Sequence, residues 1–220
     1  MVKAVIFDLD GTLCNTVEDL KTAINATLAK LGYRQRSLND VIKYIGNGSK
    51  EFVKRSLPKD VQDIDFIFET ALEVYNNEYR KHYNEKTVPY EGVKSMLMSL
   101  KGMGYKLGVL SNKQDEFVND IINTHFGKDL FNVVMGNADL PPKPDPAVAI
   151  AVAKQLKIRP SRCVLVGDSD VDVTTSINAG MQIIGVDWGY REEEVLRQAG
   201  ALNIAHKPEE IVEIIKRFDS

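Results

Sequence analysis

Hydrophobic positions along the chain fall into short runs of β-forming residues separated by longer segments of helical periodicity. The short runs cover residues 4–7, 107–110, 133–135, 164–166 and 183–186. Strands that alternate with helices are joined by crossover connections, which is typical of a mainly parallel sheet. The pattern therefore predicts an α/β fold whose core is a doubly wound, Rossmann-like parallel sheet.

One interval departs from this alternation. Between residues 15 and 85 the chain shows no convincing strand, only amphipathic helical stretches at 17–31, 38–45, 50–57 and 64–83. A helical insert of about seventy residues is longer than a single crossover needs. We therefore expect a core domain formed by residues 1–14 and 86–220, and a helical cap domain formed by residues 15–85.

Composition narrows the possible partners. The 28 basic and 31 acidic residues give a net charge of −3, so we expect neither nucleic acid nor an anionic membrane as partner. The first apolar run ends at Asp8, which is too short for a signal peptide or a membrane span. Cys14 and Cys163 have no metal-type spacing and fit unpaired thiols in a reducing compartment. We expect a cytoplasmic protein, either a monomer or a homodimer.

Polar side chains follow four of the predicted strands. Ligands of open parallel sheets bind beyond the carboxyl ends of the strands, so these residues are expected at one edge. They are Asp8, Asp10 and Thr12, then Ser111 and Asn112, then Lys143, and finally Asp168 and Asp172. Carboxylates about 4 Å apart repel by roughly 4 kcal/mol a pair at an effective dielectric constant of about 20. Lys143 and a cation must compensate, and an incomplete set of oxygen ligands suits Mg²⁺ better than Ca²⁺.

Four motifs, in this order, resemble those of the haloacid dehalogenase-like hydrolase superfamily. They are FDLDGT (7–12), LSN (110–112), the lysine of PPKPDP (141–146) and GDSDVD (167–172). The number of residues between the first two motifs is similar to that in members of the superfamily with a helical cap inserted after the first strand. Further stretches resemble the phosphoglycolate phosphatases: TVEDLKTAIN (16–25), IGNGS (45–49), PYEGV (89–93), GYKLGVLSNK (104–113) and GVDWGY (185–190). The resemblance implies a Mg²⁺-dependent phosphomonoesterase acting on a small phosphorylated metabolite such as 2-phosphoglycolate.

The resemblance also implies a role for each motif residue. Asp8 would attack phosphorus and form an aspartyl-phosphate intermediate. Asp10 would protonate the leaving oxygen and then activate water. Asp8, the backbone carbonyl of Asp10 and Asp168 would hold Mg²⁺, while Asp172 would orient these ligands or Lys143.

The substrate would be held by core and cap. Its phosphoryl oxygens are expected to contact Ser111, the amide of Asn112 and Lys143, with Thr12 keeping the loop in shape. Lys113 could face either the phosphate or the solvent. A turn of Gly46, Asn47 and Gly48 precedes a predicted cap helix, for which Ser49 is a candidate N-cap, and free N–H groups there could hold a substrate carboxylate. The alternative is a capped turn with solvated basic neighbours. Thr16 is expected to cap the first cap helix, and a hydrogen bond to the substrate is the alternative.

Other activities stay open. Pyrophosphatase and nucleotidase activity remain possible because cap loops set selectivity. A β-phosphoglucomutase-like transferase is disfavoured because the cap histidine of that family corresponds to Leu20 here. A dehalogenase would not need Asp10, and no cap lysine is marked as the Schiff-base lysine of a phosphonate hydrolase. From other classes, a phosphoacceptor signalling domain would be much shorter and lack a cap, and the intact acids argue against a non-catalytic scaffold.

Overall fold

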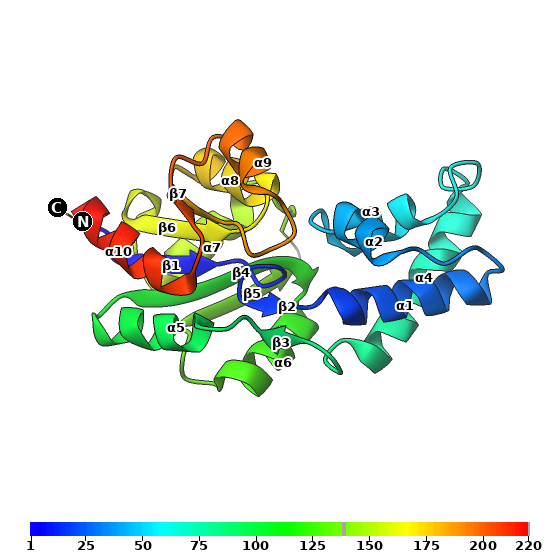
Figure 1. Ribbon diagram of the computed structural model, residues 1–220, viewed down its shortest axis with the longest axis horizontal. Helices are drawn as coiled ribbons and strands as arrows, with labels where there is room; N and C mark the ends of the chain where they lie inside the picture. The colour runs from blue at the N-terminus through cyan, green and yellow to red at the C-terminus, as the bar shows by residue number, and fades with distance from the viewer. Residues whose placement is uncertain (138–139, 220) are drawn as a thin grey trace. The chain divides into compact units, whose positions relative to one another are not determined.

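The computed structural model describes residues 1–137 and 140–219. A six-stranded parallel sheet forms its core, in the order β5-β4-β1-β6-β7-β8 (Figure 1). The strands are β1 (Ala4–Phe7), β4 (Lys106–Gln114), β5 (Val133–Asn137), β6 (Cys163–Gly167), β7 (Gln182–Val186) and β8 (Ile204–Ala205). The predicted doubly wound α/β fold is confirmed. The sequence patterns missed β8, because two residues carry no periodicity.

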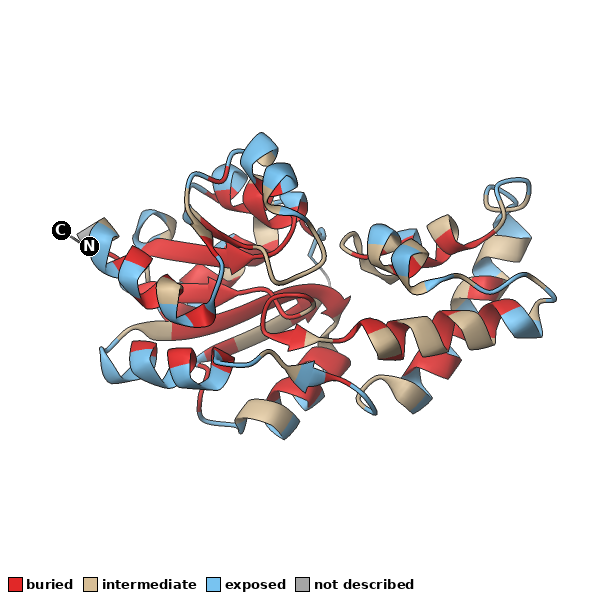
Figure 2. Ribbon diagram, in the orientation of Figure 1, coloured by how far each residue is buried: buried red, intermediate tan, exposed pale blue. Residues whose placement is uncertain are grey.

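Both faces of the central strand are buried, as is usual in parallel sheets. All four residues of β1 lie in the interior, and so do all five of β6. Helices α5 (Val93–Gly102), α7 (Ala147–Leu156) and α8 (Asp170–Ala179) pack on the sheet, each with its buried face toward the strands (Figure 2). The remaining elements of this part are α6 (Asp115–Phe126), α9 (Glu193–Ala199), α10 (Pro208–Asp219) and a short 3₁₀ turn (Pro160–Arg162).

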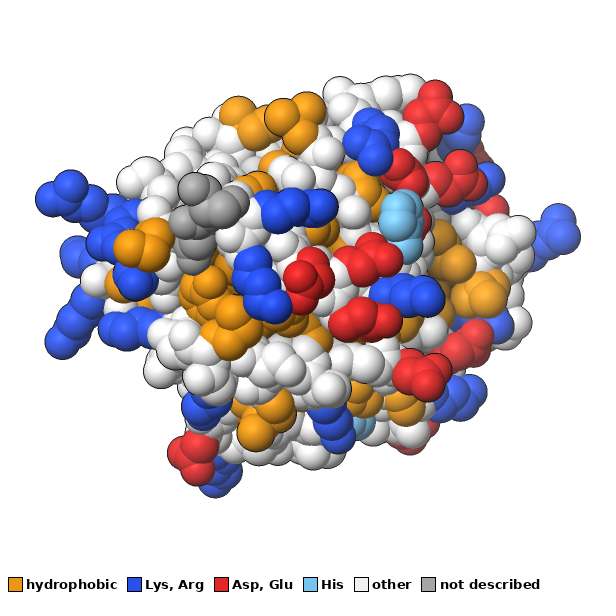
Figure 3. Space-filling model, turned by 60° about the vertical axis from the view of Figure 1, so that its left-hand side comes forward, with side chains coloured by type: hydrophobic (Ala, Val, Ile, Leu, Met, Phe, Trp, Pro, Cys, Tyr) orange, Lys and Arg blue, Asp and Glu red, His pale blue; other side chains and the backbone are white. Residues whose placement is uncertain are grey.

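The chain divides into two compact units. One comprises Met1–Asn15 and Pro89–Ser220, and the other comprises Thr16–Val88. The short strands β2 (Cys14–Asn15) and β3 (Val88–Pro89), which form a separate two-stranded sheet, lie where the chain passes from one unit to the other. On the face drawn in Figure 3, acidic and basic side chains are interspersed, in keeping with the small net charge.

The second unit is helical. It contains α1 (Val17–Lys30), α2 (Leu38–Tyr44), α3 (Gly48–Ser56) and α4 (Asp65–His82), and α1 packs along α4. The ring of Tyr75 stacks on Tyr79 and meets the edge of Phe52, with centroids 5.6 Å apart in each pair. Helices were predicted for all four segments, and each is found within two residues of its predicted ends. None of the described helices is long and apolar enough to cross a bilayer.

Two buried carboxylates hold this helical unit together. Asp19 of α1 accepts hydrogen bonds from the backbone N–H groups of Lys86 and Thr87 and from the Thr87 hydroxyl, at 2.8 to 3.0 Å. Lys30 and Lys81 donate to Glu78 Oε1 over 2.8 and 2.7 Å. These two hydrogen bonds lower the pKa of Glu78 to about 2, against a usual value of 4.5.

One predicted helix cap is wrong, and a second lies at the predicted position without the capping hydrogen bond. Helix α3 begins at Gly48 with Asn47 at its N-cap, so Ser49 lies inside the first turn and cannot cap it. Thr16 does occupy the N-cap of α1, but its side chain makes no capping hydrogen bond. Its ψ of 0° departs from the extended backbone that points a capping oxygen at the first turn. Both differences concern local geometry that hydrophobic periodicity does not specify.

Candidate active site

The loop after β1 is a tight turn that places Asp8 at the edge of the sheet. The Asp8 N–H donates to Val166 O over 2.9 Å, which continues the pairing of β1 with β6. The N–H groups of Leu13 and Cys14 both donate to Leu9 O at 3.0 Å and close the turn. Gly11 has a φ of +86°, and a Cβ there would lie 2.3 Å from an Asp168 oxygen. Glycine is therefore required by the backbone conformation and by the close approach of Asp168.

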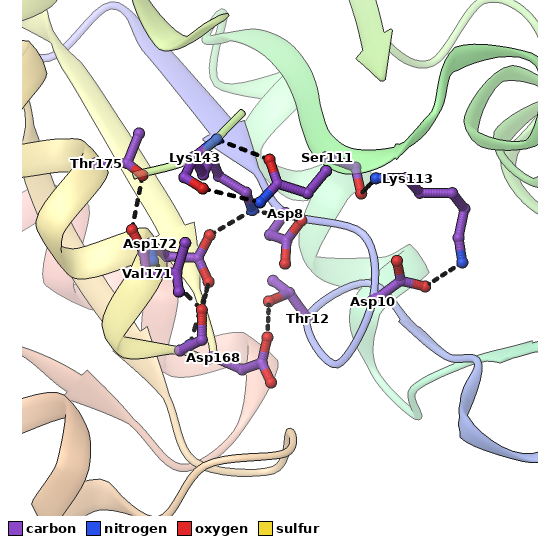
Figure 4. Close-up of polar contacts among 12 residues, drawn as sticks. Asp8, Asp10, Thr12, Ser111, Lys113, Lys143, Asp168, Val171, Asp172 and Thr175 are labelled. Atoms are coloured by element: carbon purple, nitrogen blue, oxygen red, sulfur yellow. Dashed lines mark hydrogen bonds and ion pairs between the residues drawn. The ribbon is translucent and has the colours of Figure 1, made fainter. Parts of the chain in front are cut away.

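Lys143 joins two acids in the interior of the site (Figure 4). Its ammonium nitrogen lies 2.9 Å from Asp8 Oδ1 and 2.6 Å from Asp172 Oδ1, and all three side chains are buried. The side chain of Asn112 fixes the lysine backbone, because it accepts from the Lys143 N–H at 2.8 Å and donates to the Lys143 carbonyl at 3.1 Å. The Asn112 side chain therefore positions Lys143.

Asp168 is held by two segments that are far from it in sequence. The Thr12 hydroxyl donates to Oδ1 over 3.1 Å, and the Tyr190 N–H donates to Oδ2 over 2.7 Å. The Trp188 indole N–H donates to the Thr12 carbonyl at 3.1 Å, and a Cβ on Gly189 would lie 2.3 Å from Asp168 Cβ. The segment 188–190 thus shapes the site, although the sequence analysis assigned no site role to its residues. The signal that could have exposed this role is a glycine beside two aromatic residues directly after a strand.

The last motif places Asp172 through a capping box at the start of α8. Asp172 Oδ2 accepts from the hydroxyl and the N–H of Ser169, at 2.5 and 3.2 Å, which leaves Oδ1 for Lys143. A Cβ on Gly167 would come within 2.4 Å of Asp172, so this glycine lets the helix start approach the strand. Asp170 points outward at the first turn, as expected for a charge favoured by the helix dipole.

Asp10 pairs with a lysine that the sequence left ambiguous. Lys113 Nζ donates to Asp10 Oδ1 over 2.6 Å, and the lysine is buried. The Lys113 N–H also donates to the Ser111 hydroxyl at 3.2 Å. The carboxyl end of β4 thus contacts the Asp10 carboxylate through Lys113, which links the first motif with the second.

The three acids Asp8, Asp168 and Asp172 offer oxygens within 4.8 Å of one another. Burial raises the pKa of Asp8 well above its usual value, although Lys143 opposes this shift. Burial also raises the pKa of Asp168 to about 7, with the charge of Asp172 acting in the same direction. For Lys143 itself, burial acts to lower the pKa, but the charges of Asp172 and Asp8 outweigh it and the pKa is raised.

This cluster fits a hard divalent cation. With all three carboxylates ionised, one ammonium group would leave two negative charges in a buried place. Burial and, after it, the charges of the neighbouring acids raise the pKa values of Asp8 and Asp168, so a bound cation would favour the ionised forms. Oxygen ligands without histidine or cysteine suit Mg²⁺. The donor set of the described residues therefore matches the cofactor expected from the sequence.

The predicted core residues come together at the carboxyl ends of neighbouring strands. Those in contact with another predicted site residue are Asp8, Thr12, Asn112, Lys143, Asp168 and Asp172, while Asp10 and Ser111 are joined to Lys113. Gly46, Asn47 and Gly48 lie in the helical unit, at the junction of α2 and α3. Their part in substrate binding stays a prediction.

Comparison with known proteins gives the family. The model of the family described as haloacid dehalogenase-like hydrolase matches residues 5–186. The chain belongs to this family. The predicted family membership is confirmed, and so is the prediction of a phosphatase within it, since its curated relatives are phosphatases.

Curated relatives of this hydrolase share about a third of its sequence. A protein of Psychrobacter arcticus named phosphoglycolate phosphatase is 38% identical over 200 residues, which cover 88% of this chain and 87% of the relative. A phosphoglycolate phosphatase of Nitrosospira multiformis is 35% identical over 195 residues, covering 87% and 86%. A crystal structure from Lactobacillus delbrueckii subsp. bulgaricus, provisionally identified as a phosphoglycolate phosphatase, matches this chain with a TM-score of 0.91 at 28% identity. The match covers 97% of this chain and 98% of the crystallised chain.

Proposed function

We propose that this hydrolase is a Mg²⁺-dependent phosphomonoesterase that acts on a small phosphorylated metabolite, with 2-phosphoglycolate as the leading substrate. The observation that carries the proposal is the buried cluster in which Lys143 joins Asp8 and Asp172 beside Asp168. The choice of substrate is supported by the names of the curated relatives. The helical unit would serve as the cap.

Asp8 is suited to attack phosphorus. Its Oδ1 is held by Lys143 at 2.9 Å, and Oδ2 is the oxygen that would attack. Attack forms a bond from an Asp8 oxygen to phosphorus and breaks the bond from phosphorus to the ester oxygen, which leaves with a proton from Asp10. Water then attacks the aspartyl phosphate, its proton passes to Asp10, and inorganic phosphate and the free carboxylate of Asp8 result. The contact with Lys113 keeps the Asp10 side chain in place.

Asp8, Asp168 and the backbone carbonyl of Asp10 would hold Mg²⁺, which would neutralise phosphoryl oxygen charge near Asp8. Asp172 is better suited to positioning than to binding the ion, because its two oxygens already accept from Lys143 and Ser169. Ser111, Asn112 and Lys143 would face the phosphoryl oxygens, and the ammonium group offsets charge that builds up there. The loop of Gly46, Asn47 and Gly48 would receive the substrate carboxylate. The free thiols of Cys14 and Cys163 suit a reducing compartment, and we place the activity in the cytoplasm.

Replacement of the nucleophile tests the catalytic proposal. We expect Asp8→Asn to lower phosphate release by about a thousandfold or more, because no covalent intermediate can form. Asp170→Asn makes the same chemical change at a half-exposed carboxylate of the GDSDVD motif and should keep activity within about twofold. EDTA should abolish wild-type turnover and added Mg²⁺ should restore it. Activity of Asp8→Asn equal to that of Asp170→Asn would overturn the proposal.

A panel of phosphorylated compounds tests the substrate. It should contain 2-phosphoglycolate, a hexose phosphate, a nucleoside monophosphate and inorganic pyrophosphate, compared by kcat/KM. We expect 2-phosphoglycolate to rank first. A different leading compound would refute the substrate assignment and leave the phosphatase standing, and transfer of phosphate to a sugar instead of water would identify a phosphotransferase.

A further inference from the structure

The helical unit contains a cavity of about 490 Å³ whose lining is strongly basic. Arg34, Arg36, Arg55 and Lys59 all line it. The first two come from the connection between α1 and α2, Arg55 from the last turn of α3, and Lys59 from the connection between α3 and α4. Segments that are separate in the sequence therefore bring four cations to one place, in a chain whose net charge is −3.

The positions of these cations are set by local bonds. The Arg36 guanidinium donates through Nε to the Ser56 carbonyl over 2.7 Å, and the Arg36 backbone exchanges two hydrogen bonds with the Asn25 side chain, at 2.8 and 3.0 Å. Arg55 lies 3.7 Å from Glu51, one turn back on the same helix. The described residues that line the cavity include no carboxylate. Most of the positive charge is therefore not neutralised within the lining.

The uncharged part of the lining limits the kind of anion. Tyr44, Leu57 and Pro58 give the cavity an aromatic and aliphatic wall, and Gln62 adds an amide. Arginine forks bind phosphate groups through two parallel hydrogen bonds, and an aromatic ring offers a stacking surface for a flat base. The volume lies within the range of about 300 to 1,000 Å³ usual for small-molecule sites. A compact inorganic anion would leave this wall without a contact.

We propose that this cavity binds a nucleotide carrying at least two phosphate groups. The phosphates lie against the arginine and lysine side chains, and the base lies against Tyr44. The site consists of residues of the helical unit alone, and none of them belongs to the catalytic residues of the other unit. The inference does not depend on the proposed phosphatase activity, because binding is measured without turnover.

The test measures binding of ADP to the full chain by calorimetry in buffer with EDTA. The double variant Arg34→Gln/Lys59→Gln removes two cations from exposed positions. Arg36 is left intact because its guanidinium bonds the Ser56 carbonyl. The control Lys43→Gln/Lys86→Gln removes the same charge from exposed positions of the same unit outside the cavity lining. We expect ADP affinity to fall about tenfold or more in the first variant and to change less than about twofold in the control.

Two further measurements test the base contact. Inorganic pyrophosphate should bind more weakly than ADP, and Tyr44→Ala should weaken ADP but leave pyrophosphate unchanged. Equal ADP affinity in the two double variants, or no ADP binding by the wild type at about 1 mM, would overturn the site. Pyrophosphate binding as tight as that of ADP, with Tyr44→Ala without effect, would overturn the assignment to nucleotides. Circular dichroism spectra equal to the wild type show that the variants are folded.

Discussion

Replacement of Lys143 by methionine is the most informative perturbation of the site. Methionine keeps a long flexible side chain but removes the ammonium group that lies 2.9 Å from Asp8 and 2.6 Å from Asp172. These carboxylates are buried, and Asp168 adds a third negative charge nearby. The substitution therefore leaves three acids close together without a protein cation between them.

The size of the effect follows from these distances. At 2.6 to 2.9 Å and an effective dielectric constant of about 20, each ion pair gains roughly 6 kcal/mol of attraction. Desolvation offsets most of this gain in the wild type, but removing one member of a buried pair leaves the other member uncompensated and costs about 3–5 kcal/mol. We expect Lys143→Met to lower the free energy of unfolding by about that amount and to abolish measurable phosphate release.

Urea unfolding, followed by circular dichroism at neutral pH without Mg²⁺, measures the loss. The double variant Lys143→Met/Asp172→Asn should recover part of the stability, because it removes one uncompensated charge, yet it should stay inactive. Lys113→Met is a matched control. Lys113 is also a buried lysine, but the Asp10 carboxylate with which it pairs is partly exposed, so the loss of stability should be smaller.

Three results would refute this reasoning. The first is a loss of stability below about 1 kcal/mol for Lys143→Met, which would mean that the ammonium group does not compensate buried charge. The second is a double variant no more stable than Lys143→Met. The third is an equal loss of stability in Lys113→Met, because the number of buried carboxylates would then not matter.

Two further predictions concern stability. Gly11→Ala should lower the free energy of unfolding by more than Gly32→Ala, since both have a positive φ but only the first would push a Cβ against Asp168. The left-handed backbone alone should cost about 1–2 kcal/mol in both variants. Equal losses of unfolding free energy for Gly11→Ala and Gly32→Ala in urea would contradict the close approach of Asp168. Glu78 has a lowered pKa, so it stabilises the fold above its usual pKa of 4.5 and loses that effect as the pH falls toward about 2. The melting temperature of Glu78→Gln should therefore lie below that of the wild type near neutral pH and converge with it in acid. The control Glu73→Gln, at an exposed position, should match the wild type throughout. A difference between Glu78→Gln and wild type that stays constant with pH would contradict the lowered pKa of Glu78.

Much of the fold was predictable because the buried segments are distinctive in the sequence. Strand β1 was predicted at its observed bounds, since four apolar β-forming residues stand between polar neighbours and a parallel strand is buried on both faces. The four helices of the second unit were likewise predicted from their periodicity. Strand β8, the N-cap at Asn47 and the missing capping bond of Thr16 were not predicted, because two residues and a single backbone angle carry no periodic signal.

The sequence by itself determined which chemistry-bearing residues follow the strands, because the carboxyl ends of parallel strands meet at one edge and their polar side chains must gather there. Only the tertiary structure decided how those residues pair. Asp168 is held by the Tyr190 N–H, Asp10 by Lys113 and the Lys143 backbone by Asn112, and each of these contacts spans at least 22 positions of the chain. Such partners depend on side-chain directions and on the approach of separate loops, which are set when the sheet and its helices pack together.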